Sequence, residues 1–200
     1  MKIDTKEKIL LCALELFAKK GFDACSMNEI AAEANVNKAT IYYYFTNKEY
    51  IYEAVLVHVL SGFYTTLESD VTKEVTPQKK LLAYIYAFGK NFQKTEKMAP
   101  LMLRELASGG DNLSIEAKKI IFKNITLLNH IVELGKSENI FLEQEVFVLY
   151  LMIVGTMNMY TATSSFRKKI PPENTLSGFD LDAQELAHYI FSMVEKGIKI

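Results

Sequence analysis

The segment that decides the fold is SMNEIAAEANVNKATIYYYFTNK, residues 26–48. It predicts two short helices joined by a tight turn at residues 34–36, followed by the start of a third helix. Ser26 can cap the first helix, because Glu29 stands three residues later and completes a capping box. Asn37 can cap the second helix. Two short helices on such a turn are the helix-turn-helix shape, whose second helix enters the major groove of DNA. An ordinary helical corner without a partner would show the same pattern.

The residue string within this segment favours DNA binding over the ordinary corner. VNKATIYYYFTNKE, residues 36–49, resembles the DNA-binding signature of the TetR family of bacterial repressors. The resemblance extends back through residues 9–22 and covers roughly the first quarter of the chain. Beyond it, the chain resembles the family in helical character and length, and MAPLMLRELASGG, residues 98–110, more weakly resembles TetR-type ligand domains.

The first residues of a recognition helix meet base edges, so Lys38 is the candidate for guanine O6 and N7. Asn28 could reach an adenine edge or a phosphate. The resemblance implies phosphate contacts at Thr40, Tyr42, Tyr44 and Lys48, although a histidine is frequent in the family where Tyr44 stands. For Tyr42 we expect an inward ring and an outward hydroxyl. The candidate DNA-binding residues are Ser26, Asn28, Lys38, Ala39, Thr40, Tyr42, Tyr43, Tyr44 and Lys48.

Helical periodicity continues on both sides of this segment, which predicts an all-α chain. A first helix from Asp4, capped with Glu7, would complete a three-helix head, and residues 46–49 offer a further capping box. We expect a helix-turn-helix domain over residues 1–46, joined by a fourth helix to a helical-bundle ligand-binding and dimerisation domain over residues 47–200. The expected body helices are 47–70, a helix beginning at Pro77, 98–107, 113–137, 143–167 and 182–199, with a loop at 170–181.

The body helix at residues 143–167 carries no charge from Val146 to Phe166. That length could span a bilayer. Its second half is rich in Thr, Ser and Asn, however, which favours a helix covered on two sides by protein. We therefore expect no membrane association and a homodimer in which this helix and the last one form a four-helix interface. The candidate interface residues are Ile153, Met157, Leu186, Ile190, Met193 and Val194.

Aromatic walls with a few polar groups are typical of small-molecule sites. Inward-facing aromatic residues of the helix that begins at Pro77, and polar residues on the apolar stripes of its neighbours, predict a site for a small, mostly apolar ligand that is uncharged or weakly charged. Ordinary core packing is the alternative for each of them. The candidate ligand-binding residues are His58, Tyr84, Phe88, Phe92, Asn124, Thr156 and Asn158.

The net charge of the chain is −1, and residues 1–50 carry seven Lys and seven acidic residues, so overall charge does not mark a nucleic-acid binder. The three His residues stand apart in the sequence, and we expect no catalytic site, metal or cofactor. Two Cys and the absence of a signal sequence predict a cytoplasmic protein. The sequence thus predicts a repressor that a ligand releases from a palindromic DNA operator. A helical adaptor for other proteins and a small helical enzyme are the alternatives.

Overall fold

The computed structural model describes residues 4–171, 173 and 181–200. The helices are α1 (Thr5–Lys20), α2 (Met27–Glu33), α3 (Lys38–Tyr44), α4 (Lys48–Thr72), α5 (Pro77–Lys94), α6 (Met98–Ala107), α7 (Ile115–Ser137), α8 (Val146–Tyr150), the π-helical turn η1 (Leu151–Gly155), α9 (Thr156–Ala162), α10 (Ser164–Arg167) and α11 (Ala183–Ile198). Among the described residues, the β structure is one isolated antiparallel bridge between Phe141 and Lys199. The prediction of an all-α fold is therefore confirmed.

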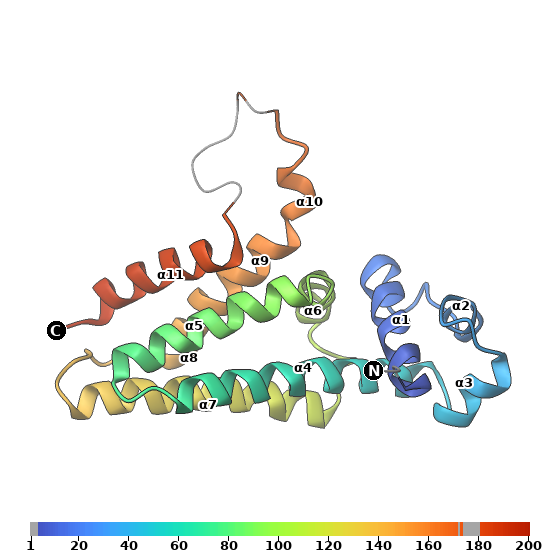
Figure 1. Cartoon of the computed structure of the whole chain (residues 1–200), viewed down its shortest axis with the longest axis horizontal. Helices are drawn as coiled ribbons and strands as arrows, with labels where there is room; N and C mark the ends of the chain where they lie inside the picture. Colours follow the sequence, from blue (N-terminus) through green and yellow to red (C-terminus); the bar gives the residue numbers. More distant parts are fainter. Residues whose placement is uncertain (1–3, 172, 174–180) are drawn as a thin grey trace.

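The head, α1–α3, lies at one end of the molecule, and α4 runs from it into the body (Figure 1). In the body α4 packs against α5 and α7, and α11 packs along α5. The helix α6 lies where head and body meet, and it contacts α1. This arrangement presents α2 and α3 at the far end of the molecule, away from the body.

Side-chain caps fix where the helices of the head begin. The Ser26 hydroxyl accepts a hydrogen bond from the backbone N–H of Glu29, and the Asn37 side chain accepts from the N–H of Thr40. Both predicted caps are confirmed. The turn between α2 and α3 contains Asn35 with a φ of +49°, a left-handed conformation that Asn tolerates better than most residues. The helix α1 ends at Gly21, whose φ of +83° likewise suits glycine.

Two predicted capping boxes are wrong. Asp4 precedes α1, but its side chain makes no capping hydrogen bond. At the start of α4 the predicted box paired Thr46 with Glu49. The cap is instead Asn47, whose side chain accepts from the backbone N–H of Tyr50. An acidic residue near a helix N-terminus still interacts favourably with the helix dipole, and this effect requires no capping geometry.

The core of the head does not close within the first 46 residues. Phe17, Ile41 and Phe45 are buried in one cluster with Ile51 and Tyr52 from the first turns of α4. The same cluster extends to residues of α6 and α7. A head of three short helices buries little surface alone, so α4 supplies the missing wall. The division between residues 1–46 and 47–200 therefore stays a prediction.

The long charge-free helix expected at residues 143–167 is interrupted. It contains the short helix α8, the wider turn η1, α9 and, after Thr163, α10. A π-helical turn adds a residue and rotates the faces of the helix that follows. None of the described helices combines the length and hydropathy needed to cross a bilayer. The loop expected at residues 170–181 lies mostly outside the described residues.

Candidate DNA-binding surface and body sites

The helix α3 buries one side and exposes the other. Ile41 is fully buried, and Phe45, directly after α3, is 1% exposed. These two side chains hold α3 against the core of the head. The opposite side presents Lys38, Ala39, Tyr42 and Tyr43 to solvent, and Tyr43 is 81% exposed. Residues four apart share a helix face, so these side chains form one continuous surface.

The side chains on this surface already contact one another. The Lys38 ammonium lies 5.8 Å from the centroid of the Tyr42 ring. The rings of Tyr43 and Tyr44 meet edge to face, with centroids 5.0 Å apart. The expectation of an inward Tyr42 ring is wrong, because Tyr42 is 46% exposed and Phe45 occupies the core beside it. Tyr42 therefore lies at the surface of α3, where it is available to a partner.

Two of the hydroxyl groups among the candidate DNA-binding residues also have structural roles. The Thr40 hydroxyl donates to the Asn37 side chain at 2.9 Å, which reinforces the cap of α3. The Ser26 hydroxyl donates to Glu29 at 3.1 Å and accepts from its backbone N–H. Asn28, two positions after Ser26 and in the first turn of α2, is exposed. Of these three residues, Asn28 has the side chain that needs no rearrangement to meet a partner.

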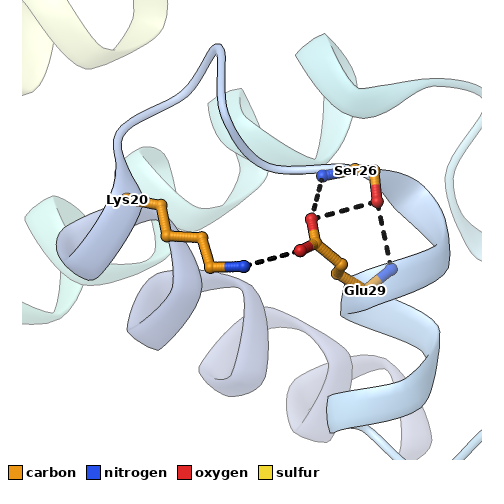
Figure 2. Close-up of polar contacts among 3 residues, drawn as sticks. All are labelled: Lys20, Ser26 and Glu29. Carbon is orange, nitrogen blue, oxygen red and sulfur yellow. Dashed lines mark hydrogen bonds and ion pairs between the residues drawn. The ribbon is translucent and has the colours of Figure 1, made fainter.

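Figure 2 shows how the capping box of α2 is tied to α1. One carboxylate oxygen of Glu29 accepts from the backbone N–H and the hydroxyl of Ser26, and the other accepts from the Lys20 ammonium at 2.5 Å. The hydrogen bond from Lys20, and then those from Ser26, lower the pKa of Glu29 from 4.5 to about 2. The same contact raises the pKa of Lys20. The end of α1 is thus fixed to the start of α2.

Lys48 does not extend toward the surface of α3. Its ammonium donates to the backbone carbonyls of Phe22 and Asp23, at 2.9 and 3.3 Å, and lies 4.3 Å from the centroid of the Phe22 ring. The position at the start of α4 was predicted correctly, but the side chain turns back to the loop between α1 and α2. Its role in this structure is to hold that loop, and a phosphate contact would require it to leave these partners.

The sequence reasoning missed two links from α6, one to α1 of the head and one to the first turns of α4. The Arg104 guanidinium donates to the carbonyls of Phe17 and Ala18 in the last turn of α1. Its neighbour Glu105 is buried and accepts from the Tyr52 hydroxyl at 2.5 Å. Burial, followed by the hydrogen bond that Tyr52 donates to Glu105, raises the pKa of Tyr52. The sequence signal for these links was the adjacent pair Arg104 and Glu105, the two charged residues of the otherwise apolar helix α6.

Five of the seven candidate ligand-binding residues lie in the interior of the body: Tyr84, Phe88, Phe92, Asn124 and Asn158. The rings of Tyr84, Phe88 and Phe92 follow one another along α5, with neighbouring centroids 5.0 and 6.2 Å apart. The Tyr84 hydroxyl donates to the backbone carbonyl of Asn124 at 3.1 Å. The side-chain oxygens of Asn124 and Asn158 are buried and have no hydrogen-bond partner among the described residues.

The other two candidates are not in this group. His58 is exposed and lines a cleft between α4 and the head. Thr156 is exposed, and its hydroxyl donates to the carbonyl of Met152 one turn earlier. Both stood at the border of an apolar stripe, where helical periodicity alone cannot decide between an inward and an outward position.

Most of the predicted dimer-interface residues lie inside the chain's own core, and the interface itself stays a prediction. Ile153, Met157, Leu186, Ile190 and Val194 are all buried within the chain's own core, so they are not free to contact a second subunit. Of the predicted set, Met193 is exposed, at 73%. The reason is the composition of residues 146–166: a charge-free helix has no polar side from which its inward face can be recognised.

The outer side of the same segment carries large exposed apolar residues. They are Phe147 and Val148 of α8, Leu151 and Met152 of η1, and Met159 of α9. The helix α11 adds Tyr189 and Met193. We call the residues of α8, η1 and α9 the outer apolar face. Contiguous apolar surface of this kind is typical of protein contact sites.

Residues 9–55 match the family model described as bacterial regulatory proteins, tetR family. The chain is also similar to curated proteins over most of its length. One is named "Probable HTH-type transcriptional regulator YttP", from Bacillus subtilis, with 29% identity over 71% of this chain and 70% of the relative. Another is the biofilm operon icaADBC HTH-type negative transcriptional regulator IcaR of Staphylococcus epidermidis, with 26% identity over 74% of this chain and 78% of that protein.

Among solved structures, the chain is similar to the transcriptional regulator FadR from Bacillus subtilis in complex with stearoyl-CoA. The TM-score is 0.76 at 23% sequence identity, over 96% of this chain and 98% of that one. At this level of identity the similarity establishes the fold: a helix-turn-helix head on a helical body.

Proposed function

Because the chain belongs to the TetR family of bacterial regulatory proteins, we propose that it is a transcriptional repressor that binds a palindromic operator and is released by a small, mostly apolar molecule. The observation that carries the proposal is the exposed side of α3. Lys38, Tyr42 and Tyr43 project from α3, which the Asn37 cap and the buried residues Ile41 and Phe45 hold in one orientation. A rigid short helix with a cation and hydroxyls on its free side fits a major groove.

Within this surface we assign roles by position. Lys38, at the first position of α3, reads a guanine edge. Tyr42 and Tyr43 place exposed hydroxyls where phosphate oxygens pass, and phosphate contacts orient a protein on DNA without reading its sequence. Asn28 is the further polar candidate, at the start of α2. Ser26, Thr40 and Lys48 support the surface, since their polar groups already bind neighbouring residues of the head.

We infer a homodimer that pairs through the outer apolar face. A dimer also fits a palindromic operator, because each of its two heads can bind one half-site. Two heads on a two-fold axis require half-sites about one helical turn, or a multiple of it, apart. Met193 and Tyr189 on the exposed side of α11 are candidates to extend the contact.

The ligand proposal rests on the interior of the body. Buried polar groups are normally hydrogen-bonded, so the unpartnered oxygens of Asn124 and Asn158 are unusual. A ligand with a hydrogen-bond donor and an apolar body suits these oxygens and the aromatic rings of α5. The relative solved with stearoyl-CoA has the same fold, which is consistent with an acyl or other long apolar group. Release requires that the ligand bind a head arrangement that misfits the operator.

Operator selection tests the DNA proposal. Fragments of the source genome retained by the protein would be sequenced, and we expect an inverted repeat. Binding to bulk DNA should weaken steeply as salt rises, since phosphate contacts release counterions. An adaptor or an enzyme would retain no common sequence.

A compound screen tests the ligand proposal. A hydrophobic compound that acts as inducer should both raise the melting temperature and loosen the operator, and Asn124→Leu should reduce both effects. If no compound does both, the body is a dimerisation scaffold and not a sensor.

A further inference from the structure

A cleft of about 720 Å³ separates the head from the body. One wall is α1, with a contribution from Glu33 of α2, and the other is the middle of α4 and the end of α5. Its apolar residues include Leu14 and Phe63, both nearly buried. The volume is within the range of small-molecule sites. This cleft borders the aromatic interior of the body that was proposed above for the inducer, since Phe63 in its wall packs edge to face on Phe92, with centroids 5.7 Å apart.

One polar side chain in the cleft has no partner. Asn91 of α5 lines the cleft and is 7% exposed. Among the residues that the structure describes, its side-chain amide makes no hydrogen bond, while its backbone carbonyl accepts from the N–H of Thr95. The amide therefore keeps its hydrogen-bonding capacity toward the cleft, and a ligand atom can use it.

The charges around the cleft favour a cation. Among its described lining residues, carboxylates come from Glu7, Glu15, Glu33 and Glu96, and ammonium groups from Lys94 and Lys97. Lys97 is already paired with Glu15 across the opening. Burial, followed by the carboxylate of Glu33, raises the pKa of Cys12, so this thiol stays neutral and adds no charge. The four carboxylates outnumber the two ammonium groups, so the electrostatic potential in the cleft is negative.

We propose that this head–body cleft binds a small organic amine. Its apolar part lies against Leu14 and Phe63, and its protonated nitrogen donates to the Asn91 side-chain oxygen among the carboxylates. The nitrogen is thereby both hydrogen-bonded and close to opposite charge, which a partly buried cation requires. A bound amine contacts head and body together. The inference stands on the cleft itself and does not require the proposed operator or inducer.

The chain offers a clean way to block the site. Gly62 of α4 lines the cleft, and a Cβ added there would have no heavy atom within 4 Å. Gly62→Phe therefore fills the cleft without displacing the core, and Gly62→Ala is the matched control that leaves it open. Asn91→Leu removes the unpartnered amide at similar side-chain volume.

The probe is 4-phenylbutylamine, compared with 4-phenylbutan-1-ol by titration calorimetry on the whole protein without DNA. We expect the amine to bind about tenfold tighter than the alcohol, and Asn91→Leu to weaken the amine by about tenfold, because hydrogen bonds to charged groups contribute that much. Gly62→Phe should abolish binding and Gly62→Ala should keep it.

Equal affinity for the amine and the alcohol would overturn the proposal, as would unchanged binding to Gly62→Phe. A Cβ at position 62 meets no heavy atom within 4 Å, so we expect Gly62→Phe to fold. The binding measured with this variant tests the proposal even if Asn91→Leu does not fold. The titration contains no operator, so its failure leaves the proposed function untouched, and a failure to bind DNA leaves this result standing.

Discussion

The first residue of α3 carries the most specific prediction at the scale of a single side chain. Lys38 is exposed and its ammonium lies over the exposed Tyr42 ring, outside the core of the head, so its removal should not disturb the head. Lys38→Ala should cost about 1–3 kcal/mol of operator binding and relax the preference at one base pair. Fluorescence anisotropy with the operator and its single-base variants measures both effects. Lys119→Ala, an exposed lysine on α7, is the control.

An unchanged preference in Lys38→Ala would remove α3 from the major groove. Lys48 differs from Lys38 in that it stabilises the head: its ammonium donates to two backbone carbonyls of the α1–α2 loop. We expect Lys48→Met to lower the melting temperature of the protein, whereas Lys38→Ala leaves it unchanged.

Glu29 links protonation to the stability of the head. Its pKa in the folded chain, about 2, is below the ordinary value of 4.5. A lowered carboxyl pKa contributes stability that is present above pH 4.5 and is lost as pH falls toward 2. Glu29→Gln keeps an oxygen for the N–H of Ser26 but has no charge for Lys20. Its melting temperature should therefore fall less steeply than that of the wild type over this range.

Glu116→Gln is the control for this experiment, because Glu116 is an exposed acid on α7 that also faces a lysine. It should follow the wild-type pH dependence closely. If Glu29→Gln also follows the wild type, the Lys20–Glu29 contact does not stabilise the head in solution.

At the scale of elements, two glycines in helices make opposite predictions. A Cβ at Gly62 in α4 would meet open space, whereas a Cβ at Gly135 in α7 would lie 2.0 Å from the ring of Phe141. Gly62→Ala should raise the free energy of unfolding by about 0.5–1 kcal/mol, because alanine loses less conformational freedom in a helix. Gly135→Ala should lower it by about 1–3 kcal/mol through overpacking. Urea denaturation measures both, and equal effects would contradict the packing of α7 on Phe141.

The elements also differ in how well the sequence predicted them. The boundaries of α2 and α3 follow from local chemistry, since Ser26 and Asn37 are caps that act within three residues. The orientation of α8 to α9 depends on neighbours far away in the sequence, and Ile153 and Met152 are equally apolar although one is buried and the other exposed. Contacts such as Tyr52 with Glu105 join residues far apart in the chain, and no local pattern reveals them.

At the scale of the whole molecule, the outer apolar face predicts the assembly. Met152 is 58% exposed in the centre of this face, and Val75, in the turn between α4 and α5, is 83% exposed elsewhere. Met152→Asp should convert a dimer into a monomer at micromolar concentration, because a charge would be buried without a partner. Val75→Asp should leave the dimer intact. Sedimentation velocity measures the mass, and a wild-type monomer, or a dimer unaffected by Met152→Asp, would exclude this interface.

The central claim is that α3 reads a DNA sequence from a dimeric frame. Its most direct test is an anisotropy titration of the wild-type protein with the selected operator and with a scrambled duplex of equal length and composition, at the same salt concentration. We predict two subunits per operator and a preference of about 10³-fold or more, as specific DNA-binding proteins show. Equal affinity for the two duplexes would contradict the account.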